Sequence, residues 1–181
     1  MNAPKQLLDA AGVARCIRQI GEQIVEITPS PEKLVFVGIR THGVTLAQRL
    51  CDFLQQEKGW DIPLGILDIT LYRDDLEQIG PHPVMRPSHI DFDLNGSTLI
   101  LVDDVLYTGR TVRSALAQIM DYGRARVVRL AVLVDRGLRE LPIHADMVGL
   151  TVSANRDEKV EVSFQENGQE DGVWLTPRKT A

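Results

Sequence analysis

Apolar residues recur at two spacings along the chain and predict helices that alternate with buried strands. Between residues 9 and 27 they return every three or four positions, which predicts an amphipathic helix with Asp9 as its N-terminal cap and Pro29 beyond its end. The continuous apolar run Leu34–Ile39 is typical of a strand buried on both faces. A second helix is predicted over roughly 44–56.

The same alternation continues through the second half of the chain. Further strands are predicted at 62–71, 99–102, 127–134 and 145–152, and a terminal hairpin at about 158–177. A helix follows the second of these strands, on the apolar positions Val112, Leu116, Ile119 and Met120. Such an order favours an α/β fold, a parallel sheet flanked by helices. We expect one domain over 1–181, with a mobile lid at about 71–93, where Gly80 and three prolines interrupt the pattern.

Composition narrows the class of protein. The 181 residues are 44% hydrophobic and 25% charged, ordinary values for a globular chain. We expect a cytoplasmic protein, because no apolar run approaches a membrane span and the first residues lack a signal-peptide pattern. Cys16 and Cys51 fall within helical patterns far from other metal ligands, so we expect core thiols rather than a disulfide or a zinc site.

Charge leaves one question open. The net charge of −5 argues against general attraction to nucleic acid. Seven arginines nevertheless fall between residues 110 and 139. They form either a basic face for phosphates or a solvated surface with a few arginines serving an anionic substrate.

The stretch LILVDDVLYTGRT at 99–111 carries the clearest chemistry. A buried strand is followed by Asp103 and Asp104, and Thr-Gly-Arg-Thr at 108–111 then opens a helix. A loop that enters a helix N-terminus offers backbone N–H groups to a phosphate, and the carboxylates accept hydrogen bonds from sugar hydroxyls or bind Mg²⁺. The plainer alternative is a strand end followed by a helix cap at Thr108. The glycine spacing matches neither a Walker loop nor a dinucleotide fingerprint.

A second candidate loop, Gly-Ile-Arg-Thr-His-Gly at 38–43, follows the strand Leu34–Ile39. In an open α/β sheet, ligands bind at the carboxyl ends of strands. Arg40 suits a diphosphate because its planar guanidinium pairs with phosphate oxygens, and Thr41 and Gly43 bring the backbone near. The alternative is an ordinary strand-to-helix turn with an exposed arginine.

Four segments together resemble a known family. They are GIRTHG at 38–43, LDITLYRDDL at 67–76, LILVDDVLYTGRT at 99–111 and LAVLVDRGLRELPI at 130–143. The third is similar to the phosphoribosyl pyrophosphate signature of type I phosphoribosyltransferases. All four, in order, resemble the pyrimidine operon attenuation regulators that double as uracil phosphoribosyltransferases. The resemblance implies a type I phosphoribosyltransferase sheet with a small hood and a lid.

By this resemblance the reaction is uracil plus phosphoribosyl pyrophosphate giving UMP and pyrophosphate, with Mg²⁺ carried by the diphosphate. The implied catalytic residues are Asp103, Asp104, Arg40 and Arg73. The implied substrate-binding residues are Thr41, His42, Gly43, Tyr107, Thr108, Gly109, Arg110, Thr111, Val134, Asp135, Arg136 and Gly137. The acidic pair would hold the ribose hydroxyls, 107–111 the 5′-phosphate, 40–43 the pyrophosphate and 134–137 the uracil. Arg73 on the lid would close over the leaving group, and Asp104 and Asp135 would lie near the metal.

The resemblance also implies a regulatory role, in which pyr leader mRNA binds in response to UMP, UTP or phosphoribosyl pyrophosphate. Arg18, Arg139 and His144 are the candidate RNA contacts. The sequence departs from the pattern of RNA-binding members at Gln19, Glu22, Ile27, Leu138 and Leu150. We therefore expect a homo-oligomeric enzyme with weak RNA binding. The alternatives are an RNA-binding regulator with weak activity and, less favoured, an enzyme for a purine base.

Overall fold

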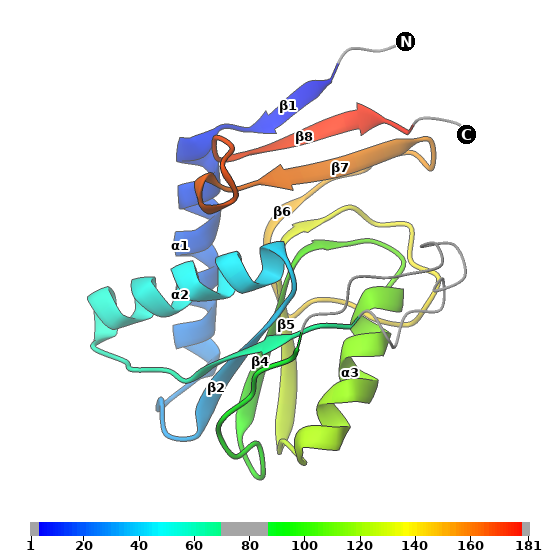
Figure 1. Cartoon of the computed structure of the whole chain (residues 1–181). Coiled ribbons are helices and arrows are strands. Elements are labelled where there is room, and N and C mark those ends of the chain that lie inside the picture. Colours follow the sequence, from blue (N-terminus) through cyan, green and yellow to red (C-terminus); the bar gives the residue numbers. More distant parts are fainter. Residues whose placement is uncertain (1–3, 70–86, 179–181) are drawn as a thin grey trace.

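A computed structural model describes residues 4–69 and 87–178, and its centre is a parallel sheet of five strands. The order is β3-β2-β4-β5-β6, and every neighbouring pair is parallel (Figure 1). The strands are β2 (Leu34–Ile39), β3 (Leu64–Leu67), β4 (Thr98–Leu106), β5 (Val127–Asp135) and β6 (Met147–Thr151). The predicted α/β class is confirmed.

Helices cover both faces of this sheet, because the side chains of β2 and β4 alternate between two apolar clusters. Phe36 and Ile100 pack with α1 (Ala10–Ile27) and α2 (His42–Lys58), whereas Val37 and Leu101 pack with α3 (Arg110–Tyr122). In Figure 1, α1 and α2 accordingly lie on one side of the sheet and α3 on the other. Within residues 4–69 and 87–178, no helix combines the length and apolarity needed to cross a membrane.

The cap predicted for the first helix is present. The Asp9 carboxylate accepts a hydrogen bond of 2.7 Å from the backbone N–H of Gly12, so one of the free amides of the first turn is satisfied. Cys16 and Cys51 are both buried free thiols, as expected. One apolar position was misjudged, because Met120 is 77% exposed and Ile119 alone of that pair enters the core.

A second, smaller sheet lies beyond the carboxyl ends of the parallel strands (Figure 1). Its order is β1-β8-β7, all antiparallel, with β1 at Lys5–Leu8, β7 at Glu158–Ser163 and β8 at Gly172–Pro177. We call this sheet the hood. Val160, Val162 and Val173 turn inward to the cluster that also holds α1, so the hood is fixed over the main sheet by apolar packing.

Two strand ends differ from the prediction by four residues each. β4 does not stop before the acidic pair but continues to Leu106, because its pairing with β5 runs on through Asp103 and Val105. β3 ends at Leu67, four residues earlier than predicted. Most of the predicted lid lies outside the described residues. Its last part, from Pro87, returns to the sheet through the two hydrogen bonds of 2.7 and 2.8 Å that Ile66 and His89 exchange.

Candidate active site

The two adjacent aspartates occupy different environments. Successive side chains of a strand point to opposite faces, so Asp103 and Asp104 diverge. Asp103 is only 6% exposed, and its carboxylate accepts a hydrogen bond of 3.0 Å from the amide of Asp104. Burial and the neighbouring Asp104 carboxylate raise the pKa of Asp103 well above its ordinary value. Asp104 keeps 24% of its side chain exposed and borders an open cavity.

His42 begins α2, shortly after the end of β2, and its ring faces Asp104 on the neighbouring strand β4. Its Nδ1 lies 3.2 Å from the Asp104 carboxylate, and this hydrogen bond raises the pKa of His42 despite partial burial. The edge of its ring contacts the buried Phe164 ring, with centroids 5.9 Å apart. The structure thus brings together a group from each of the two candidate loops.

Two glycines allow this close approach. A Cβ added at Gly43 would lie 2.5 Å from the backbone oxygen of Val102, and one at Gly38 would lie 2.6 Å from the Cα of Val44. Only glycine lets the first turn of α2 rest on β2 and β4 at this distance. The peptide bond between Arg40 and Thr41, which leads into that turn, is cis.

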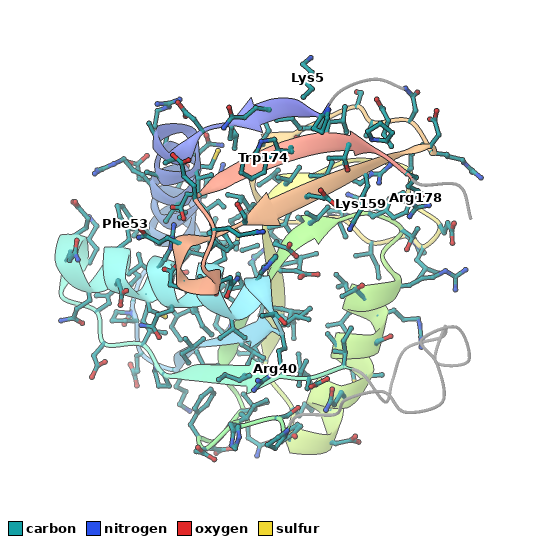
Figure 2. The ribbon with its side chains drawn as sticks, turned by 45° about the horizontal axis from the view of Figure 1, so that its top comes forward. Lys5, Arg40, Phe53, Lys159, Trp174 and Arg178 are labelled. Carbon is teal, nitrogen blue, oxygen red and sulfur yellow. The ribbon has the colours of Figure 1, made fainter. Side chains whose placement is uncertain are left out.

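Arg40 follows β2 directly (Figure 2). Its backbone N–H donates to Leu67 and one terminal nitrogen to the oxygen of Pro87, at 2.9 and 3.4 Å. Its Nε is buried and has no hydrogen-bond partner among the described residues. A buried donor without a partner is costly, so Arg40 keeps donor capacity for an anion. Arg73, also predicted to serve the leaving group, lies outside the described residues.

The predicted phosphate loop joins β4 to α3. Gly109 is the N-cap residue of α3 with φ of 93°, a conformation that favours glycine, and Arg110 and Thr111 begin the helix. The Thr108 hydroxyl accepts a hydrogen bond of 3.3 Å from the Arg110 amide. Because the first amides of a helix have no partner within it, the loop ends in a group of donors suited to an anion.

The predicted base loop at 134–137 is largely committed to internal bonds. The Asp135 carboxylate accepts hydrogen bonds from the amide of Gly137, at 2.9 Å, and from the Arg139 guanidinium. Burial alone would raise the pKa of Asp135, but these two donors outweigh it and hold the pKa below its ordinary value. Val134, which ends the apolar part of β5, is fully buried.

Arg136 is 2% exposed and binds the hood rather than facing the cavity. Its terminal nitrogens donate to the backbone oxygens of Asn155 and Glu158, at 2.8 and 3.0 Å. The guanidinium also lies 4.0 Å from the centre of the Tyr107 ring. Arg136 therefore joins three segments: the end of β5, the loop after β4 and the turn before β7.

The cavity beside Asp104 measures about 700 Å³ and lies between the two sheets. One wall holds His42 and Asp104, and the other comes from the hood and its hairpin turn, including Lys159, Glu161 and Trp174. Figure 2 shows Lys159 and Trp174 on neighbouring strands of the hood. Sequence reasoning missed this wall. Polar residues alternate with apolar ones along β7, but alternation alone does not reveal which sheet face borders a site.

The three candidate RNA contacts are not equivalent. Arg18 lies on the outer face of α1, 60% exposed, with its guanidinium 3.8 Å from Glu57. His144 is exposed in the segment before β6. Arg139 is drawn inward, with 22% of its side chain exposed and its donors directed at backbone oxygens.

Comparison with known proteins shows to which family the chain belongs. A family model described as a phosphoribosyl transferase domain matches residues 4–166. A Thermus thermophilus protein named bifunctional protein PyrR is 49% identical over 181 residues, the whole of both chains. The protein of that name from Clostridioides difficile is 50% identical over 170 residues, which are 94% of this chain and 96% of that one.

The chain belongs to the phosphoribosyltransferase family. Its full-length likeness to PyrR proteins confirms the predicted family, and with it a phosphoribosyltransferase of the PyrR type. Among solved structures, a hypoxanthine phosphoribosyltransferase from Trypanosoma cruzi matches with a TM-score of 0.74 at 16% identity, over 97% of this chain and 95% of that chain. At this identity the match supports the fold alone.

Proposed function

We propose that the protein joins uracil to the ribose 5-phosphate of phosphoribosyl pyrophosphate and releases pyrophosphate. One observation carries the proposal: the Asp104 carboxylate and His42, which lies in the turn at 38–43, border a cavity at the carboxyl ends of the adjacent parallel strands β2 and β4. This is the edge at which open α/β sheets bind ligands. A sugar held by Asp104 would lie beside the turn at 38–43, and the predicted phosphate loop at 107–111 follows Asp104 by three residues along the chain.

The bond changes require charge stabilisation rather than a nucleophile. The bond from C1′ of the ribose to the pyrophosphate oxygen breaks, a bond from C1′ to a uracil nitrogen forms, and the proton of that nitrogen is released. C1′ gains positive character on the way, which the nearby Asp104 carboxylate stabilises while it orients the ribose hydroxyls. Asp103 supports the backbone of Asp104 from behind. Arg40, whose Nε has no hydrogen-bond partner among residues 4–69 and 87–178, would receive the departing pyrophosphate.

The hood would cover the base. The cavity wall formed by β7 is an edge of the hood sheet, because β7 pairs only with β8 among the described strands. An unpaired strand edge offers backbone donors and acceptors to a planar heterocycle. The loop at 134–137, predicted to read uracil, lies beside this wall through the bonds of Arg136 to Asn155 and Glu158.

The residues of the site fit a Mg²⁺ ion that enters bound to the diphosphate, rather than one that the protein holds on its own. No group of three or more His, Cys, Asp or Glu side chains with metal-binding geometry occurs within residues 4–69 and 87–178. Of the two predicted ligands, Asp104 has an accessible carboxylate, whereas both oxygens of Asp135 accept internal hydrogen bonds. Mg²⁺ would neutralise charge on the leaving diphosphate, with Asp104 as the nearest carboxylate.

Conversion of labelled uracil in the presence of phosphoribosyl pyrophosphate tests the proposal. The matched pair is Asp104→Asn in the site and Asp52→Asn on the exposed face of α2. We expect Asp104→Asn to lower kcat/KM by about 10²-fold or more, because it removes the charge that faces the reacting carbon, and Asp52→Asn to have no effect. Absence of turnover by the unaltered protein across a range of pH and Mg²⁺ would refute the enzyme proposal.

Regulation by RNA is a second candidate, supported by the likeness to bifunctional PyrR proteins. We propose that binding to a pyr leader RNA is weak here, because Arg139 spends its donors internally and Glu22 adds negative charge to α1. A gel-shift at moderate salt tests this. Nanomolar binding enhanced by UMP or UTP would overturn it. Homo-oligomer formation stays a prediction, to be measured by sedimentation.

A further inference from the structure

We infer that Arg139 is a positioning residue for the 5′-phosphate, acting through the backbone of the loop at 107–111. The inference rests on the proposed function, since it assumes that this loop binds the phosphate of the nucleotide. It changes the role expected from the sequence, in which Arg139 was a candidate RNA contact. The geometry points instead to a partly buried guanidinium that bonds to the backbone of the loop.

Arg139 distributes its donors over three segments. Nη1 donates to the backbone oxygens of Tyr107, Gly137 and Leu106, at 2.8, 3.2 and 3.4 Å. Nε donates to the oxygen of Ile143 at 2.9 Å. Nη2 donates to the Asp135 carboxylate, which also balances the charge. A planar fork with five N–H donors makes this set of bonds possible, and a lysine ammonium does not match it.

Other bonds from the same segment complete the pattern on the loop. The oxygen of Leu106 also accepts from the amide of Arg136 at 3.1 Å. The oxygen of Thr108 accepts from the amides of Glu140 and Leu141, at 3.0 and 3.1 Å. Three consecutive carbonyls of the loop are therefore bound on the side of residues 136–141.

The orientation of the amides follows from the planarity of the peptide bond. In a trans peptide, the C=O and the N–H of one unit point in opposite directions. Fixing the carbonyls of residues 106, 107 and 108 on one side turns the amides of residues 107, 108 and 109 to the other. Those amides lead directly into the first turn of α3, whose amides have no partner within the helix. The result is a continuous group of donors, the arrangement that binds phosphate at helix N-termini.

Removal of Arg139 should weaken the binding of the 5′-phosphate more than the binding of the rest of the nucleotide. Without Arg139, the oxygen of Tyr107 loses its bond at 2.8 Å, and the peptide unit between Tyr107 and Thr108 is free to rotate. The donors of the loop then no longer converge. Affinity for a ligand with a 5′-phosphate falls. The contact of Asp104 with the ribose is kept. The base loop loses its two bonds from Arg139 but keeps the hydrogen bond from the Gly137 amide to Asp135, so affinity for the ribose and base falls less.

Calorimetric titration with UMP and uridine tests this inference, because the two ligands differ only in the 5′-phosphate. The unaltered protein should bind UMP more tightly than uridine. In Arg139→Gln we expect the Kd for UMP to rise about tenfold or more. The Kd for uridine should rise clearly less, because the base loop loses its bonds from Arg139 but keeps the one from the Gly137 amide to Asp135. Arg124→Gln, on an exposed residue at the opposite end of the sheet, is the matched control and should change neither.

Four outcomes overturn the inference. A folded Arg139→Gln variant that keeps the full preference for UMP does so, and so does an equal loss of affinity for both ligands. If Arg139→Gln fails to fold, Arg139→Lys decides, because a lysine cannot reach Tyr107 and Asp135 together. A folded Arg139→Lys protein with undiminished preference for UMP is the third. If the unaltered protein itself binds UMP no better than uridine, the phosphate loop of the proposed function fails, and the inference falls with it.

Discussion

Substitution of Gly43 by alanine should lower the enzymatic activity far more than its loss of folding stability explains. Gly43 lies in the first turn of α2, against the backbone of β4, one residue after His42. An alanine Cβ would lie 2.5 Å from the oxygen of Val102 and 3.1 Å from the Cα of Asp103. Both neighbours are backbone atoms of a central strand, which is hydrogen-bonded on both sides and cannot yield. The helix must therefore move instead.

The required movement is large on the scale of the site. Ordinary contact of a Cβ begins at 3.4 Å, so the start of α2 must retreat by about 0.9 Å, the difference between 3.4 and 2.5 Å. The His42–Asp104 hydrogen bond, now 3.2 Å, would lengthen beyond 3.5 Å and break. A misplacement of about 1 Å lowers a rate by about 10²-fold. Overpacking costs about 1–3 kcal/mol, reduced slightly by the better helix propensity of alanine.

The assay compares kcat/KM for uracil conversion with the free energy of unfolding in urea. Gly59→Ala is the matched control, since Gly59 is the C-cap residue of the same helix, with φ of 69° and no atom near its added Cβ. That change should cost about 1–2 kcal/mol through backbone strain alone. We expect both variants to lose comparable stability, but only Gly43→Ala to lose activity.

Two results would refute this reasoning. One is a Gly43→Ala protein with unaltered kcat/KM, which would show that the close approach of α2 to β4 does not set the site geometry. The other is an equal loss of activity in Gly59→Ala, which would show that activity follows global stability rather than the position of His42.

Other predictions concern the two thiols and the ion pairs of Arg49 with Glu166 and Asp171, which we call the clamp because they join α2 to the turn between β7 and β8 of the hood. Arg49 pairs with Glu166 at 2.6 Å and with Asp171 at 2.5 Å, so Arg49→Met should lower the free energy of unfolding by about 2 kcal/mol in urea at neutral pH. Hydrogen bonds from Arg49 lower the pKa of Glu166 and of Asp171 in the folded protein. The stability from these two pairs is therefore complete above the carboxyl pKa of the unfolded chain and is lost as the pH falls through the lower pKa of the folded protein. The difference in unfolding free energy between Arg49→Met and the unaltered protein should shrink below about pH 4. Burial raises the pKa of Cys51 to about 12 and also raises the pKa of Cys16. A thiol reagent at pH 8 should therefore react slowly with the folded protein, whereas in denaturant it should modify both thiols rapidly.

Each of these has a contrary result. Equal stability of Arg49→Met and the unaltered protein at pH 7 would show that the clamp contributes nothing. A stability difference that stays constant down to pH 3 would show that the two carboxylates are not the groups involved. Rapid modification of a thiol in the folded protein would contradict the burial of both cysteines.

Local pattern was sufficient wherever one segment carries its own signal. Leu34–Ile39 is a strand in the structure at the predicted boundaries, because an apolar run that short, following prolines and ending in a turn, is typical of a strand buried on both faces. Asp9 caps the first helix as predicted, since capping depends on residues three positions apart. The acidic pair and the loop at 108–111 were recognisable because their chemistry lies within thirteen consecutive residues.

The tertiary structure alone decided which polar groups remain available. Asp103 and Asp104 look alike in the sequence, yet only Asp104 borders the cavity, because β4 continues past both and turns their side chains to opposite faces. From the sequence, Arg136 was predicted to bind substrate and Arg139 to contact RNA. Their partners are backbone oxygens, which no residue pattern displays.

The hood illustrates the same limit at larger scale. β1 is four residues long and gains its structure from pairing with β8, which lies more than 160 residues away along the chain. The alternation of helices and strands, the acidic pair and two candidate anion-binding loops could be predicted from the sequence, because periodicity and capping act over a few residues. Only the tertiary structure decided the hood wall of the cavity and the inward role of Arg139, because strand pairing and burial depend on which distant segments meet.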